Sequence, residues 1–200
     1  MTPDLLTALI GFAFVSSITP GPNNMMLMAS GANFGLRRTV PHMLGVSLGY
    51  SFMVTMVGVG LVQIFDLFPL TYTLMKIASV AYLLYLAWKI ANAAPSTPNA
   101  PDTAGRPFSF LQAVAFQWVN PKGWIMALTA ITAYTADRTM ANVLIVAGIF
   151  LLTGLPSITI WTVLGQQLRR FLTNAARLRA FNIVMALLLV GTLWPILAGH

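Results

Sequence analysis

The sequence predicts an all-α integral membrane protein with six transmembrane helices, arranged as two inverted three-helix repeats. Three observations predict this class: the scarcity of charge, the number of long apolar stretches, and the matching breaks in two of them. Hydrophobic residues make up 58% of the 200 residues and charged residues 8%, whereas a soluble domain carries about 25% charged residues. The mean hydropathy is +0.79. Most of the surface is therefore expected to face lipid.

Six stretches are long enough to cross a bilayer, which takes roughly 20 mostly apolar residues. They cover residues 5–34, 40–64, 71–91, 108–134, 140–164 and 181–197. The chain is expected to form one membrane domain over residues 1–200, with a first half at 1–92, a polar linker at 93–107 and a second half at 108–200. Residues 1–4 contain no Lys or Arg, and the apolar run after them is too long for a signal peptide. The first stretch is therefore expected to remain as a helix.

The basic residues predict the orientation. Eight of the eleven Lys and Arg residues lie in or beside the first, third and fifth loops: Arg37, Arg38, Lys89, Arg106, Arg169, Arg170, Arg177 and Arg179. Loops rich in Lys and Arg stay in the cytoplasm. Both termini are therefore expected outside the bacterial cytoplasmic (inner) membrane, in the periplasm. The same distribution favours topology signals and contact with anionic lipid over nucleic-acid binding.

Two of the six stretches are interrupted at corresponding places. The first contains Thr19, Pro20, Gly21, Pro22, Asn23 and Asn24, and the fourth contains Asn120, Pro121, Lys122 and Gly123. The two interruptions lie about half the chain apart, so each half has three spans and the first of each is broken. An odd number of spans inverts the second half, and inverted repeats with broken helices are typical of transporters whose substrate site lies where the breaks meet. A pair of ordinary proline kinks is the structural alternative.

Lys122 is the most informative single residue because it lies about 21 Å along the fourth stretch, counted from Phe108 at 1.5 Å per residue. A lysine this deep cannot reach the interface, and such a residue is a functional-site hypothesis by default. No Asp or Glu lies in the middle of any span. Three alternatives remain: Lys122 contacts helix-end carbonyls and nearby Asn side chains, it is neutral, or it meets a substrate carboxylate. A structural lysine at a broken helix is the simplest of these.

The same residues carry a resemblance to a known family. Residues 19–23 resemble the (S/T)PGP motif of the LysE/RhtB family of amino-acid exporters, and residues 120–122 resemble its NPK motif. The similarity extends to the size, the six spans, the run at residues 81–88 and the basic loop before the last helix. Within that family the chain is most similar to the cysteine and O-acetylserine exporters, through Asn23, Asn24 and residues 86–90.

The resemblance implies efflux of small amino acids or their derivatives, driven by the proton gradient, and a homodimer. One region departs from the family. Several members carry an Asp in the fifth helix, where this chain has Thr153, Gly154, Leu155, Pro156 and Ser157. This departure argues against coupling through a carboxylate and against recognition of a substrate amine by an acidic side chain.

Other functions have weaker support. Residues 45–49 match the G-x-S-x-G pattern of serine hydrolases around Ser47, but His42 is on a different part of the helix surface and no other base is near in sequence. The same residues form G-x-x-x-G, a helix-packing motif. A metal exporter would need clustered His, Cys, Asp or Glu in the spans, and the chain has no Cys. No catalytic residue, metal or cofactor is expected.

The predicted function is export of a small amino acid or close relative by alternating access, through a site made of Thr19, Pro20, Gly21, Pro22, Asn23, Asn24, Asn120, Pro121 and Lys122. The prolines and Gly21 would break the helices, the three asparagines would offer polar contacts, and Lys122 would supply the charge. A helix N-terminus would favour a substrate carboxylate. The principal alternative is a broader small-molecule permease of the same architecture. The alternative from another class is an intramembrane serine hydrolase that uses Ser47.

Overall fold

The chain folds into helices throughout the part that the structure describes. The computed structural model describes residues 1–61, 63, 67–68, 70–93, 106–135 and 139–194. In chain order the helices are α1 (Pro3–Ile18), α2 (Pro22–Phe34), α3 (Leu36–Met56), the π-helical turn η1 (Val57–Leu61), α5 (Leu70–Ala91), α6 (Phe110–Gln117), α7 (Pro121–Tyr134), α8 (Met140–Leu168) and α9 (Ala175–Gly191). The first and fourth predicted spans are each two helices, which confirms that both are broken.

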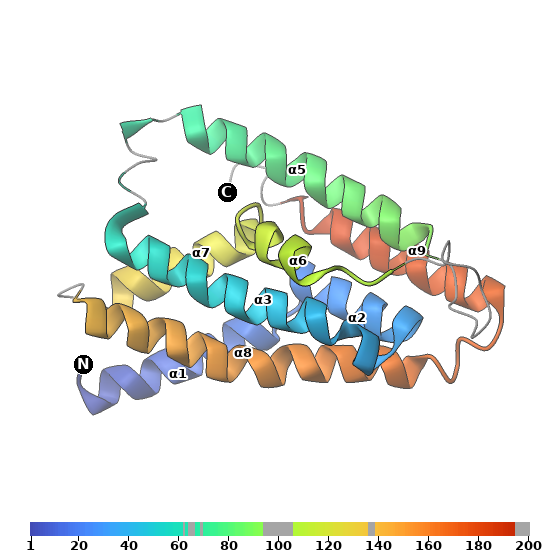
Figure 1. Ribbon diagram of the computed structural model, residues 1–200, viewed down its shortest axis with the longest axis horizontal. Coiled ribbons are helices and arrows are strands. Elements are labelled where there is room, and N and C mark those ends of the chain that lie inside the picture. The colour runs from blue at the N-terminus through green and yellow to red at the C-terminus, as the bar shows by residue number, and fades with distance from the viewer. Residues whose placement is uncertain (62, 64–66, 69, 94–105, 136–138, 195–200) are drawn as a thin grey trace.

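The helices form a bundle in which sequence-distant elements lie together (Figure 1). Helix α8 is the centre of one layer and packs against α1, α2 and α3, while α6 packs against α3. Helices α5 and α9 pair with each other at the other side of the bundle. The short helices α6 and α7 lie between these groups in the view of Figure 1. The two breaks are thereby brought close together, with Lys122 of α7 bonded to Thr19 at the end of α1.

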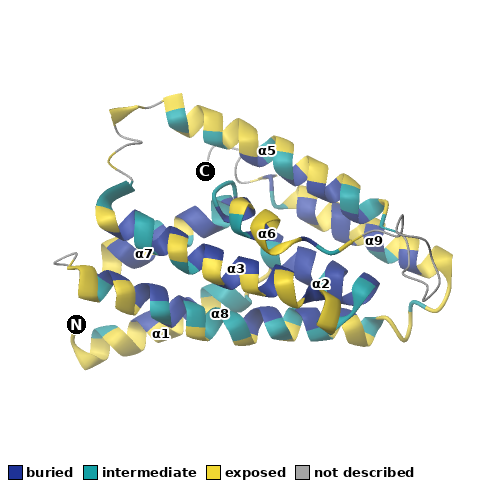
Figure 2. Cartoon of the chain, in the orientation of Figure 1, coloured by how far each residue is buried: buried dark blue, intermediate teal, exposed yellow. Residues whose placement is uncertain are grey.

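Helix lengths and apolar surface fit a membrane protein. Within the described ranges, three helices are long and apolar enough to cross a membrane: Leu36–Leu61, Leu70–Ala91 and Met140–Leu168. The pair α1 and α2, bent by 52° at its break, qualifies together as a fourth. Leu74, Ile77, Leu152 and Leu187 are all more than half exposed, and Figure 2 shows exposed residues along the outer face of α5. Apolar side chains on this scale need lipid rather than water around them.

Glycines set how closely two helix pairs approach. A Cβ atom at Gly31 of α2 would collide with the Thr162 carbonyl of α8, and one at Gly165 would collide with the Met28 carbonyl of α2. Gly45 of α3 faces the Phe110 carbonyl at the start of α6 in the same way. Small residues at such crossings let helix backbones come into contact in membranes. Residues 45–49 therefore serve as the helix-packing motif that their spacing indicated.

The predicted boundaries hold for most spans, with one clear correction. The sixth stretch was expected to begin at residue 181, but α9 begins at Ala175, because Asn174 accepts a hydrogen bond from the Arg177 N–H (2.8 Å) and caps the helix. Arg177 and Arg179 consequently lie in the helix and not in the loop before it. Most of the predicted linker at residues 93–107, and the end of the sixth stretch at residues 195–197, lie outside the described residues.

Candidate substrate site at the two helix breaks

The first break follows from the two prolines on either side of Gly21. Thr19 is extended (φ −62°, ψ 144°), as expected for a residue before a proline. Pro20 has no N–H to continue α1, and Pro22 occupies the first position of α2, where the missing N–H costs nothing. The axis bends by 52° here. The last carbonyls of α1 are left without helical partners and need others.

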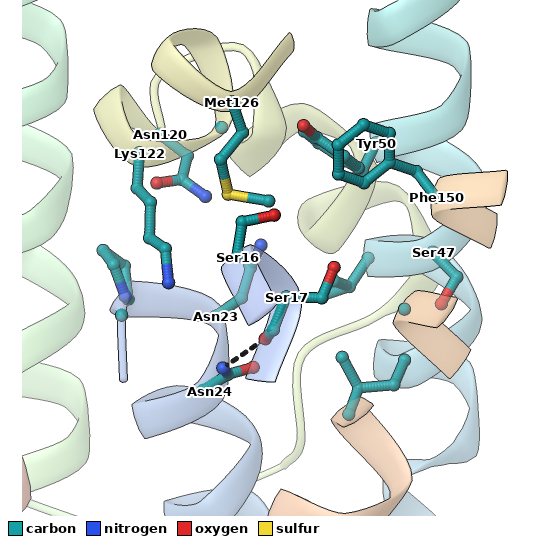
Figure 3. Close-up of a pocket in the computed structure, with 16 residues that line it drawn as sticks. Ser16, Ser17, Asn23, Asn24, Ser47, Tyr50, Asn120, Lys122, Met126 and Phe150 are labelled. Carbon is teal, nitrogen blue, oxygen red and sulfur yellow. Dashed lines mark hydrogen bonds between the residues drawn. The ribbon is translucent and has the colours of Figure 1, made fainter. Parts of the chain in front are cut away.

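Side chains from three helices satisfy these carbonyls. Asn24 of α2 donates from Nδ2 to the carbonyl oxygens of Ser17 and Thr19, both at 2.8 Å, and the first of these bonds is drawn in Figure 3. From α8, the Ser157 hydroxyl donates to the Ser17 oxygen (2.8 Å) and the Trp161 Nε1 to the Ile18 oxygen (3.0 Å). The end of α1 therefore depends on tertiary contacts, as irregular backbone inside a membrane must.

Lys122 of α7 completes this set. Its Nζ donates to the Thr19 carbonyl oxygen (2.8 Å), to the Thr19 hydroxyl (2.9 Å) and to the Pro20 carbonyl oxygen (3.4 Å). A cation at a helix C-terminus also interacts favourably with the helix dipole. The sequence left three alternatives open for Lys122, and in this structure its Nζ contacts helix-end carbonyls. The side-chain oxygen that it also contacts belongs to a threonine and not to an asparagine. Gly21 makes room for it: a Cβ there would lie 2.7 Å from the Lys122 Cδ.

The second break is closed mainly by its own backbone. Asn120 is extended (φ −88°, ψ 105°) before Pro121, which is the first residue of α7. The N–H groups of Trp118, Val119 and Asn120 each donate to the carbonyl three residues earlier, at 3.1 to 3.3 Å. The Trp124 indole donates to the Trp118 oxygen (2.9 Å). This tight turn needs little from the rest of the bundle.

A pair of amides joins the two breaks. Asn23 donates from Nδ2 to the Gln117 Oε1 (2.8 Å), and Gln117 donates from Nε2 back to the Asn23 Oδ1 (3.2 Å) and to the Ala113 carbonyl (2.9 Å). Gln117 is fully buried. This reciprocal pair fixes the start of α2 against the end of α6, so that the breaks lie next to each other.

A cavity of about 60 Å³ lies where the breaks meet (Figure 3). It is lined by Ser16, Ser17, Gly21, Pro22, Asn23, Asn24, Val46, Ser47, Tyr50, Asn120, Lys122, Gly123, Met126, Phe150, Gly154 and Ile158. The helices α2 and α7 both begin at this cavity, and neither N-cap residue, Gly21 or Asn120, bonds its own helix through a side chain. Two helix N-termini that lack a side-chain cap provide positive potential and N–H donors for a carboxylate.

The structure brings most of the predicted residues together. Gly21, Pro22, Asn23, Asn24, Asn120 and Lys122 all line the cavity. Thr19 and Pro20 contact Lys122 but are not among the lining residues, and Pro121 starts α7 behind the cavity wall. The sequence predicted all nine residues in one site. In this structure Thr19, Pro20 and Pro121 belong to the breaks themselves and do not line the cavity.

Sequence reasoning missed the residues that helices α3, α6 and α8 contribute. Ser157, Trp161 and Gln117 support the breaks, and Ser47 and Tyr50 line the cavity. No spacing within the sequence connects these residues to either break. The one available signal was a run of polar side chains inside apolar spans, which is not specific by itself.

The serine-hydrolase alternative and a pair of tryptophans near the second break can also be compared with the structure. In the described part of the chain no hydrogen bond links Ser47 to a histidine, and its hydroxyl has no protein partner, so the arrangement a serine nucleophile requires is missing there. Trp118 and Trp124 pack edge to face, with ring centroids 6.1 Å apart, and neither lines the cavity. They are packing residues.

Comparison with known proteins places this architecture in a family. The family model described as LysE type translocator matches residues 14–192. The chain is 31% identical to the "Cysteine/O-acetylserine efflux protein" of Escherichia coli (strain K12) and to that of Shigella sonnei (strain Ss046), over 95% of this chain and 96% of each relative. No solved structure matches. The family model covers both breaks and every residue that lines the cavity, and the chain belongs to the LysE family of translocators, which are membrane transport proteins and not enzymes.

Proposed function

We propose that this protein exports small amino acids or their derivatives from the bacterial cytoplasm. The observation that carries the proposal is the cavity between the two helix breaks, which holds a lysine and is open to two helix N-termini. An amino acid presents a carboxylate to every transporter that binds it, and this cavity offers the donors that a carboxylate needs. The relatives named above export cysteine and O-acetylserine, so these compounds are the first candidates.

Alternating access through two inverted halves is the mechanism we propose. In this scheme α1 with α2, α3 and α5 form the first half, and α6 with α7, α8 and α9 form its inverted counterpart. The packing supports two equivalent halves, because the long helix of each half packs on the broken span of the other half. Helix α3 packs on α6, and its counterpart α8 packs on α1. Helices α3 and α8, which would be equivalent, also pack on each other, as do α5 and α9. The six spans would then cross the inner membrane with both termini in the periplasm.

Lys122 is proposed to alternate between two partners. Without substrate, its Nζ rests on the Thr19 and Pro20 oxygens. When a substrate enters, the same ammonium can turn to its carboxylate, because Lys has a flexible stem and three rotatable donors. Loss of a proton from Lys122 would release the carboxylate and couple export to the proton gradient. Among the described residues that line the cavity there is no Asp or Glu, and Lys122 is the one basic side chain. We also propose a homodimer, which rests on the resemblance to the LysE/RhtB family alone.

Export from cells preloaded with labelled amino acids tests the function. The panel contains cysteine, O-acetylserine, threonine, homoserine, leucine and lysine, and the intact chain is compared with Lys122→Ala and Lys122→Arg at equal amounts in the membrane. We expect at least one compound to leave faster with the intact chain, and this advantage to disappear in Lys122→Ala. If the intact chain exports no compound on the panel, the assignment is wrong. If export survives in Lys122→Ala, the lysine is structural and the coupling scheme fails.

A further inference from the structure

Three unpartnered polar groups lie in the wall of the same cavity. In the described part of the chain, five buried side-chain atoms have no hydrogen-bond partner: both ring nitrogens of His42, the Ser47 Oγ, the Tyr50 Oη and the Asn120 Oδ1. Ser47, Tyr50 and Asn120 are at most 9% exposed, and all three line the cavity at the breaks. Buried polar atoms are nearly always hydrogen-bonded, so each exception needs an explanation.

The hydroxyl of Ser47 is exceptional among its neighbours. On α3, the Thr55 hydroxyl bonds the Ser51 carbonyl (3.0 Å) and the Ser51 hydroxyl bonds the Ala147 carbonyl (3.1 Å). On α8, the Thr159 hydroxyl bonds the Leu155 carbonyl (2.7 Å). Thr55 and Thr159 bond the carbonyl four residues earlier in their own helices, which is a common arrangement for Ser and Thr inside a helix, whereas Ser51 bonds across to α8. Ser47 does neither, which leaves its hydroxyl available to the cavity.

Tyr50 also has an unpartnered hydroxyl at the cavity, and packing fixes the position of its ring. It lies three residues after Ser47, so both side chains project from one face of α3. Its ring packs edge to face against Phe150 of α8, with centroids 5.2 Å apart. Figure 3 shows Tyr50 and Ser47 on one side of the cavity and Lys122 on the other, with Asn120 beside Lys122. The cavity therefore has a cationic side and a side of neutral hydroxyls.

We propose that Ser47, Tyr50 and Asn120 recognise the ammonium group and the side chain of the substrate while Lys122 binds its carboxylate. This inference rests on the proposed function. The Asn120 Oδ1 can only accept, so it suits the substrate ammonium and removes the need for an acidic residue. The hydroxyls of Ser47 and Tyr50 donate and accept, so they suit a polar side chain such as a thiol, a hydroxyl or an ester. An aliphatic amino acid would leave both hydroxyls unpaired, and sites built to bond a polar substrate group reject analogues that lack it strongly.

The test measures selectivity in competition. Cells that contain labelled O-acetylserine and labelled leucine are compared for the intact chain, Ser47→Ala, Tyr50→Phe and the double variant, at equal amounts in the membrane. We expect the intact chain to prefer O-acetylserine, and the ratio of the two export rates to fall about tenfold or more in the double variant through loss of O-acetylserine export, since the hydroxyls that select the polar side chain are gone. Ser51→Ala is the matched control, because Ser51 is on the same helix, bonds to the backbone and does not line the cavity.

A stability measurement separates recognition from folding. Because the two hydroxyls have no protein partners, the purified double variant should unfold at a temperature no lower than that of the intact chain when substrate is absent. Added O-acetylserine should raise the unfolding temperature of the intact chain and not that of the variant. An unchanged export ratio in the double variant overturns this inference and leaves the exporter assignment intact. An intact chain that exports neither compound also overturns this inference, whereas the exporter assignment is overturned only if the intact chain exports none of the six compounds on the full panel.

Discussion

The two helix breaks contain similar residues but are stabilised in different ways. At the first break, the carbonyls that end α1 are bonded by side chains of α2, α7 and α8. At the second break, consecutive N–H groups bond carbonyls three residues earlier, and one indole adds a further bond. The first break is therefore assembled by the bundle, whereas the second is largely local. In the proposed mechanism Lys122 exchanges its bonds to Thr19 and Pro20 for a substrate carboxylate, so we expect the first break, and not the second, to change during transport.

The largest expected effect comes from separating α8 from α2. Gly165→Leu places a side chain against the Met28 carbonyl, where even a Cβ collides with backbone. Overpacking of this kind costs about 1–3 kcal/mol or more, and here it would also withdraw Ser157 and Trp161 from the first break. We expect little folded protein in the membrane, measured by size-exclusion profiles in detergent. Gly148→Leu on the same helix is the control, because a Cβ at Gly148 meets nothing within 4 Å; equal losses in both variants would contradict the crossing argument.

The next effect comes from removing the α8 donors of the first break. The double variant Ser157→Ala with Trp161→Phe leaves the Ile18 carbonyl without its indole donor and the Ser17 carbonyl with Asn24 alone. At about 0.6–1 kcal/mol for each interhelical bond, the free energy of unfolding should fall by about 1–2 kcal/mol in a denaturant titration. Thr159→Ala is the control, because that hydroxyl bonds within its own helix. A double variant as stable as the control would show that the first break does not depend on α8.

A smaller effect is expected from crowding Lys122. In Gly21→Ala the new Cβ would lie 2.7 Å from the Lys122 Cδ and 3.1 Å from its Nζ, so the lysine side chain must shift, and we expect its bonds to the Thr19 and Pro20 oxygens to weaken. The backbone of Gly21 is extended (φ −172°) and accepts alanine. We expect export to fall about tenfold, equivalent to about 1.4 kcal/mol, with little change in the unfolding temperature. Gly11→Ala on α1, where nothing lies within 4 Å, should export normally. Normal export by Gly21→Ala would mean that the position of Lys122 is not important.

The smallest effect is expected at the second break. Trp124→Phe keeps a ring in the core but removes the indole bond to the Trp118 carbonyl. Since the turn retains its three backbone bonds, we expect a loss of about 0.6 kcal/mol in the free energy of unfolding and unchanged substrate preference. The comparison of the two breaks would be wrong if this single change destabilised the protein as much as the double change on α8.

Much of the fold followed from local rules. The apolar stretches predicted the helices, and Pro20, Pro22 and Pro121 predicted both breaks, because proline affects the residue before it and its own N–H whatever surrounds it. The start of α9 was placed six residues too late, because counting apolar residues excluded Arg177 and Arg179, while the Asn174 cap decides where the helix begins.

The candidate site could be predicted only in part. Lys122 and the asparagines were identified by their depth and their position at the breaks, and six of the nine predicted residues line the cavity. Asn23 was predicted to offer a polar contact to the substrate and lines the cavity, and in this structure its amide also pairs with Gln117, a residue 94 positions away, which the sequence did not indicate. Ser47 and Tyr50 could not be found from α3 alone, because only the packing of α3 against α6 and α8 turns them toward the breaks.

The sequence by itself determined that this chain is a membrane protein, where two of its apolar stretches break and that a lysine lies beside one of the breaks. These properties depend on composition and on the backbone chemistry of proline, which act over a few residues. The tertiary structure alone decided which groups satisfy the exposed carbonyls and which polar side chains remain unpaired in the cavity. Those outcomes depend on distances between helices that are far apart in sequence, and close approach at Gly31, Gly45 and Gly165 sets these distances.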